Sequence, residues 1–136
     1  MASILRVNTL TDASSNNSTP MATVNQGTAK AWINFNGGGT IAARDSFNVG
    51  SLTDSGTGKY DINYSSNMGN TSYIISTLSS NLDGNDDANQ RISGERKSNT
   101  RSTSMTPVHS GDWFYVSSAT FSDGTNFYTS THGDSA

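Results

Sequence analysis

The residues best suited to chemistry form a short acidic run, Asp83-Gly84-Asn85-Asp86-Asp87. Calcium prefers several hard oxygen ligands, which carboxylate and amide side chains supply. Counted from Asp83, an EF-hand loop requires glycine at its sixth position and glutamate at its twelfth. The chain has Ala88 and Gly94 at those positions. The sequence therefore favours a solvated turn over a calcium site.

Other catalytic or metal-binding patterns are not found. The chain has no cysteine, and its two histidines, His109 and His132, stand apart from each other in the sequence. It contains neither the GxSxG motif of a nucleophile elbow nor a phosphate-binding loop. We therefore expect no enzymatic activity, no cofactor, and no catalytic, cofactor-binding or metal-binding residues.

Basic and aromatic side chains are the remaining candidates for binding. The basic group Arg91, Arg96, Lys97 and Arg101 could meet an anionic polysaccharide, although a solvated loop paired with nearby aspartates is favoured. Trp32 falls on the polar face of its expected strand. There it could stack on a sugar, although a subunit contact is favoured because aromatic residues are enriched at interfaces.

The composition indicates one turn-rich β domain. Hydrophobic residues make up 32% of the 136 residues and charged residues 14%, yet there are five Tyr, five Phe and two Trp. A disordered chain would combine few aromatics with a high net charge, whereas the net charge here is −3. This acidic balance argues against a nucleic-acid partner, and no apolar run is long enough to span a membrane.

Apolar residues alternate with polar ones in short segments separated by Gly, Asn, Asp and Ser, which is typical of half-buried β-strands. Frequent turn signals and the absence of βαβ alternation predict an all-β fold, an antiparallel β-sandwich or jelly roll. Ile41, Phe47 and Val49 are candidate core residues of one strand. The expected strands are residues 4–10, 29–35, 40–49, 60–64, 73–78, 103–108, 113–121 and 127–128.

Three regions are expected to lie outside this regular structure. Residues 1–26 form an extended N-terminal arm and linker, and residues 27–136 form the sandwich domain. Residues 79–103 are polar and read as a long exposed loop, in which Ile92 could belong to a short edge strand. The polar tail, residues 129–136, is expected to be frayed.

The first 78 residues resemble a β domain of tail-fibre and virion structural proteins from tailed bacteriophages, particularly cyanophage-like ones. The strongest part of the resemblance runs from Gly27 to Gly37, with the sequence GTAKAWINFNG. It continues through Ile41 to Val49, the turn DSGTG at residues 54–58, and YDINY at residues 60–64. The resemblance implies a virion structural protein, but it carries over no catalytic residue.

These observations predict a phage virion structural protein, a tail-fibre or fibre-tip component with a host-adhesion role. The alternative is a capsid decoration protein that stabilises the head. The expected location is the virion. The expected partners are other copies of the chain in a homotrimer and other virion proteins, with a host surface glycan as a further candidate. Nucleic-acid binding and membrane insertion are not expected.

Overall fold

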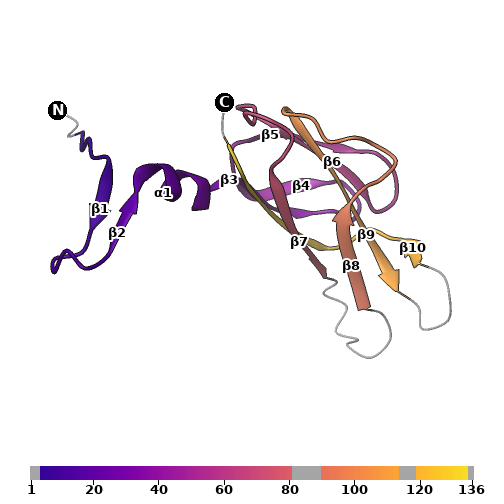
Figure 1. Ribbon diagram of the computed structural model, residues 1–136. Helices are drawn as coiled ribbons and strands as arrows, with labels where there is room; N and C mark the ends of the chain where they lie inside the picture. The colour runs from indigo at the N-terminus through magenta and orange to yellow at the C-terminus, as the bar shows by residue number, and fades with distance from the viewer. Residues whose placement is uncertain (1–3, 81–89, 114–118, 135–136) are drawn as a thin grey trace.

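The computed structural model describes residues 4–80, 90–113 and 119–134 of the chain. It is an all-β sandwich of antiparallel sheets, preceded by an extended N-terminal arm (Figure 1). The predicted fold class is therefore confirmed. Nowhere in the described ranges is there a helix with the length and apolar character needed to cross a bilayer.

One layer of the sandwich is a four-stranded sheet with the order β4-β3-β11-β7. The two central strands, β3 and β11, come from opposite ends of the domain sequence and pair with each other, so that Phe127 of β11 lies opposite Phe35 of β3. The last described strand of the chain is thus an inner strand of this sheet. The bounds are β3 (Ala29–Asn36), β4 (Ala42–Phe47), β7 (Ile74–Ser80) and β11 (Asn126–His132).

The other layer is a five-stranded sheet built around the long strand β9. Strands β6 and β10 pair with successive parts of β9, β5 pairs with the outer side of β6, and β8 also pairs with β9. The bounds are β5 (Val49–Asp54), β6 (Lys59–Tyr64), β8 (Gln90–Glu95), β9 (Met105–Trp113) and β10 (Ala119–Phe121).

The core lies between the two sheets and is built from alternate residues of their strands. Ala31, Ile33 and Phe35 of β3 are buried, whereas Trp32 between them is exposed. At the centre, the Phe35 ring stacks on Phe127 with centroids 4.9 Å apart and meets Tyr60 edge-on at 5.1 Å. Such aromatic packing supplies much of the apolar burial in a chain with few aliphatic residues.

Part of the core is polar, and tyrosine hydroxyl groups form hydrogen bonds with the buried polar groups. The Tyr64 hydroxyl lies 2.5 Å from Thr106 Oγ1 and 3.1 Å from Thr131 Oγ1. The Tyr73 hydroxyl donates to the Ser102 carbonyl oxygen at 2.8 Å and lies 2.9 Å from Thr106 Oγ1. Burial raises the pKa of Tyr73 to about 12. Thr106 and Thr131 can therefore be buried, because the hydroxyl group of each has a hydrogen-bond partner.

A tight corner joins the two sheets at Asn48, between β4 and β5. Asn48 adopts a positive φ of 56°, which asparagine tolerates better than most residues. Its Nδ2 donates to the carbonyl oxygens of Lys30 and Ser66, both at 3.0 Å. The expected strand 40–49 is therefore divided here. Phe47, expected in the core, lies on the outer face and is 53% exposed, whereas Ile41 and Val49 pack against the core.

The polar tail was predicted incorrectly. Residues 129–132 belong to β11, and the side chains of Thr129 and Thr131 are buried. The expectation of a frayed tail fails because threonine is β-branched and suits a strand, and because the Thr131 hydroxyl is hydrogen-bonded to Tyr64 inside the core. His132 accordingly lies at the end of an inner strand.

Three other expectations need correction. The region 79–103 is not one exposed loop, because β7 extends to Ser80 and β8 forms a six-residue strand that includes Ile92. The expected strand 113–121 is wrong, since its ends lie on β9 and β10, which pair antiparallel. The first strand is also wrongly placed, because β1 covers only Thr9–Thr11 rather than residues 4–10.

Gly58 and Gly39 have nearly equal φ angles but differ in how closely other atoms approach them, so alanine substitutions should affect stability differently. Gly58 has φ 63°, and a Cβ there would lie 2.8 Å from both the nitrogen and the carbonyl oxygen of Ser122. Gly39 has φ 65°, but a Cβ there would meet no atom within 4 Å. We expect Gly39→Ala to cost about 1 kcal/mol for the left-handed conformation, and Gly58→Ala about 2–5 kcal/mol because overpacking is added.

Urea unfolding of both variants measures this difference. The backbone of Gly58 also restricts any relaxation, because its nitrogen donates to Asp123 Oδ1 at 2.6 Å and its oxygen accepts from Ser110 at 2.8 Å. Equal losses in free energy of unfolding for the two variants would contradict the close approach at Gly58.

Candidate functional site

Among the described residues, the two histidines lie on different sheets. The acidic run at residues 83–87 lies outside the described residues. His109 lies on β9 of the five-stranded sheet and His132 on β11 of the other sheet. Across the described ranges, no group of three or more His, Cys, Asp or Glu residues is placed to hold a metal ion.

The basic group of the sequence divides into separate environments. Arg96 is 8% exposed and forms an ion pair with Asp61 of β6. Arg101 pairs with Glu95 and lies over the Tyr73 ring, 5.2 Å from its centroid. The expected pairing with an aspartate therefore holds for Arg96, which is buried rather than solvated, whereas Arg101 pairs with a glutamate. Lys97 has no ion-pair partner among the described residues.

The N-terminal arm stands away from the sandwich (Figure 1). Strand β1 pairs with β2 (Ser18–Pro20) as a hairpin, and the short helix α1 (Met21–Gly27) follows. Asp12 organises the turn by accepting hydrogen bonds from the Asn16 backbone and the Asn17 side chain, which lowers the pKa of Asp12. The apolar residues that precede and enter the hairpin nevertheless remain exposed: Ile4, Leu5, Val7 and Leu10.

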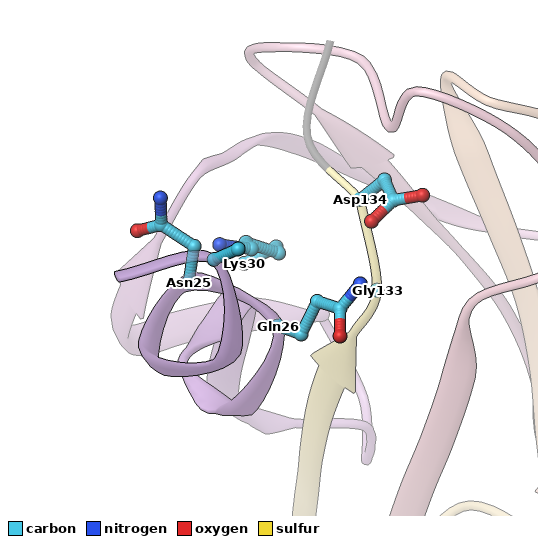
Figure 2. Close-up of a pocket in the computed structure, with 6 residues that line it drawn as sticks. Asn25, Gln26, Lys30, Gly133 and Asp134 are labelled. Atoms are coloured by element: carbon cyan, nitrogen blue, oxygen red, sulfur yellow. The ribbon is translucent and has the colours of Figure 1, made fainter. Parts of the chain in front are cut away.

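A polar depression of about 380 Å³ marks the junction between the arm and the sandwich. Figure 2 shows Gln26 of α1 extending toward Gly133 in the segment that follows β11, while Asn25 projects from another side of the helix and Lys30 of β3 lies behind it. Asp134 in that segment accepts a hydrogen bond from Asn70 Nδ2 at 3.1 Å. No residue of α1 is buried.

The outer face of the four-stranded sheet carries large apolar side chains, which we call the aromatic face. Trp32 lies beside Phe47 in the β3–β4 register, and Tyr128 lies beside Leu78 in the β11–β7 register. All four are exposed, and Ile74 adds a fifth exposed apolar residue at the start of β7. Trp32 thus occupies the outward position that the alternation of its strand predicts.

The outer face of the five-stranded sheet holds a different feature, which we call the cationic depression. It has a volume of about 440 Å³, and its base combines Phe121 of β10 with His109 of β9. The two rings meet edge-on with centroids 5.6 Å apart. Lys59 Nζ lies 4.7 Å from the Phe121 centroid. The remaining lining residues come from the end of β8 and the turn after it: Glu95, Arg96, Lys97 and Ser98.

The charges of the cationic depression are only partly compensated. Two of the charged lining residues have partners: Arg96 forms an ion pair with Asp61, and Glu95 forms one with Arg101. Their charges are therefore neutralised locally. Neither Lys59 nor Lys97 has an ion-pair partner among the described residues. Burial lowers the pKa of His109 below its usual value, and the nearby Arg96 lowers it further, which favours the uncharged ring. The two lysines therefore give this depression a local positive charge.

Sequence reasoning selected Arg96 and Lys97 but missed Lys59, His109 and Phe121 as members of one site. These residues come from four segments far apart in the chain, and only the pairing of β6, β8 and β10 with β9 brings them together. Lys59 follows a glycine turn, and Phe121 was expected to share a strand with Trp113. No local motif links the three positions.

Comparisons with known proteins identify no relative of this chain. Neither a scan against protein-family models nor searches of curated proteins and of solved structures found a match.

Proposed function

We propose that this chain is a non-catalytic structural module of a tailed-phage virion, a tail-fibre or fibre-tip component with a host-adhesion role. The observation that carries the proposal is the N-terminal arm, whose apolar side chains find no cover within the described chain. Ile4 and Leu5 are 76% and 81% exposed. Large apolar surfaces left open in this way are typical of contacts with other chains.

The arm is suited to joining copies of the chain into a homotrimer. A β-prone segment can add to the edge of a neighbouring sheet and gain main-chain hydrogen bonds. The helix α1, which connects the arm to the sandwich, buries none of its residues. The low apolar content of the domain also favours burial between chains. The resemblance of the first 78 residues to virion modules supports the same assignment.

Light scattering on the full chain tests the assembly role. We expect a mass three times that of one chain, and a monomeric mass after Leu5→Asp and Leu10→Asp are introduced together, because charges cannot enter an apolar contact without cost. The matched control places two aspartates at exposed arm positions that are not large and apolar, Ala13→Asp and Thr23→Asp, and should remain trimeric. A monomeric wild-type chain at micromolar concentration, or trimers of the Leu5/Leu10 variant, would contradict the proposed assembly.

Labelled antibody on intact phage particles tests the location. Label on the tails is the expected result, and label over the head would instead favour the capsid decoration role. If the antibody labelled neither tails nor heads, the proposal that the chain is a virion component would be contradicted.

A further inference from the structure

We propose that the cationic depression on the outer face of the five-stranded sheet binds an acidic sugar unit, a saccharide bearing a carboxylate or a sulfate group. The ligand class deepens the adhesion role proposed above and in that respect rests on it. The depression lies on the opposite side of the sandwich from the aromatic face, and binding there does not require the arm.

The shape and lining of the depression match a sugar ring. A volume of about 440 Å³ is within the range of about 300–1,000 Å³ that is usual for small-ligand sites. Phe121 is 46% exposed and offers an aromatic surface to the apolar C–H face of a sugar. The Ser98 hydroxyl, which also lines the depression, can exchange hydrogen bonds with sugar hydroxyl groups.

The charge of the depression calls for an acidic group on that sugar. Lys59 Nζ lies 4.7 Å from the Phe121 ring centroid, and Lys97 lines the same depression, so two lysines contribute to its charge. The carboxylate of Glu95 does not cancel them, because it is engaged by Arg101 through two nitrogen atoms. A ligand anion placed between the lysines would gain charge-assisted hydrogen bonds while its ring contacts Phe121.

A buried donor supports the same interpretation. Arg96 lines the depression, and its Nη2 is bound to Asp61, but its Nε is buried and has no hydrogen-bond partner in the described structure. Most buried polar atoms in proteins have a partner, so an isolated donor beside a depression requires an explanation. A sugar oxygen that reached Nε after a small shift of the lining side chains would provide one.

The balance of charges favours a single acidic sugar over a nucleic acid. The whole chain has a net charge of −3, which repels a long phosphate polymer. Among the described residues, the local excess of positive charge at the depression comes from Lys59 and Lys97, which line it together with Phe121. That arrangement suits one or two anionic groups held close to one ring.

Titration calorimetry on the full-length purified protein tests the proposal with four probes at low salt. Trigalacturonate carries carboxylates, sulfated dextran oligomers carry sulfates, and neutral dextran oligomers of the same length carry neither. A single-stranded oligonucleotide is the fourth probe. We expect binding of one or both acidic saccharides, weaker binding of the oligonucleotide, and none of the neutral oligomer. The better acidic ligand identifies which anionic group the site prefers.

Variants of the depression show whether binding occurs there. Lys59→Gln and Lys97→Gln should each weaken binding about fivefold or more, and Lys97→Arg should retain it. Phe121→Leu should also weaken binding, because it removes the aromatic surface but keeps apolar volume. The control Lys30→Gln removes the same charge from the other sheet and should have no effect.

Failure of this test can be distinguished from failure of the proposed function. The titrations use no phage particle and no arm variant, so particle labelling and arm-dependent assembly are measured independently. The site is wrong if neither acidic saccharide binds at millimolar concentration, if Lys30→Gln weakens binding as much as Lys97→Gln, or if the oligonucleotide binds more tightly than both saccharides.

Discussion

Replacing Phe127 by alanine is expected to lower the free energy of unfolding by about 3–5 kcal/mol, the usual cost of truncating a buried aromatic side chain. Phe127 is fully buried at the centre of the core. Its ring stacks on Phe35 and meets Tyr60 edge-on with centroids 5.7 Å apart. The cavity would therefore remove contacts with both sheets at once. Urea unfolding, followed by tryptophan fluorescence, measures the loss.

Phe47 offers a matched control for this variant. It is also a phenylalanine of the four-stranded sheet, but it lies on the aromatic face and is 53% exposed. Phe47→Ala should change the free energy of unfolding by about 0.5 kcal/mol or less, as for most surface substitutions. A loss at Phe47 as large as the loss at Phe127 would show that the aromatic face is not open to solvent.

The core that these variants test could be predicted largely from the sequence. Strand β6 alternates Tyr60, Ile62 and Tyr64 with polar residues, and all three are buried. The same alternation in β3 places Phe35 inside and Trp32 outside. Period-2 patterns are informative here because one face of each sheet is buried and the other is not.

The second large effect is expected from the buried ion pair. Asp61→Ala should lower the free energy of unfolding by about 3–5 kcal/mol, because it leaves the Arg96 guanidinium buried without its counter-charge. Asp61 also accepts a hydrogen bond from Ser55 at 2.7 Å and one from Asn99 at 3.4 Å, and these partners would be lost together. Thermal and urea unfolding of the variant measure the change.

The ion pair of Glu95 and Arg101 provides the comparison. It joins the same two kinds of charged group, but its side chains are about one third exposed. Glu95→Ala should therefore cost about 1 kcal/mol or less, since exposed ion pairs contribute little. Similar losses for Asp61→Ala and Glu95→Ala would contradict the special importance of the buried pair.

Neither the buried ion pair of Asp61 and Arg96 nor the buried threonines could be predicted from the local sequence pattern. Asp61 and Arg96 are brought together by the pairing of β6 and β8 with β9, which is a property of the sheet rather than of either segment. Thr129 and Thr131 resemble solvated tail residues until Tyr64 is known to lie opposite Thr131 across the core. The cationic depression was missed for the same reason, because its members depend on strand order.

The position of β11 between β3 and β7 also determines when the domain can fold during synthesis. Strand β3 emerges from the ribosome about 90 residues before its partner β11, so its edge waits unpaired while most of the domain is translated. Such long sequence separation between paired strands slows folding, since the intervening chain must be closed into a loop first. Until then Phe35 of β3 lacks its stacking partner Phe127. Nascent chains of this protein should therefore depend on chaperones to a degree that the compact native sandwich does not reveal.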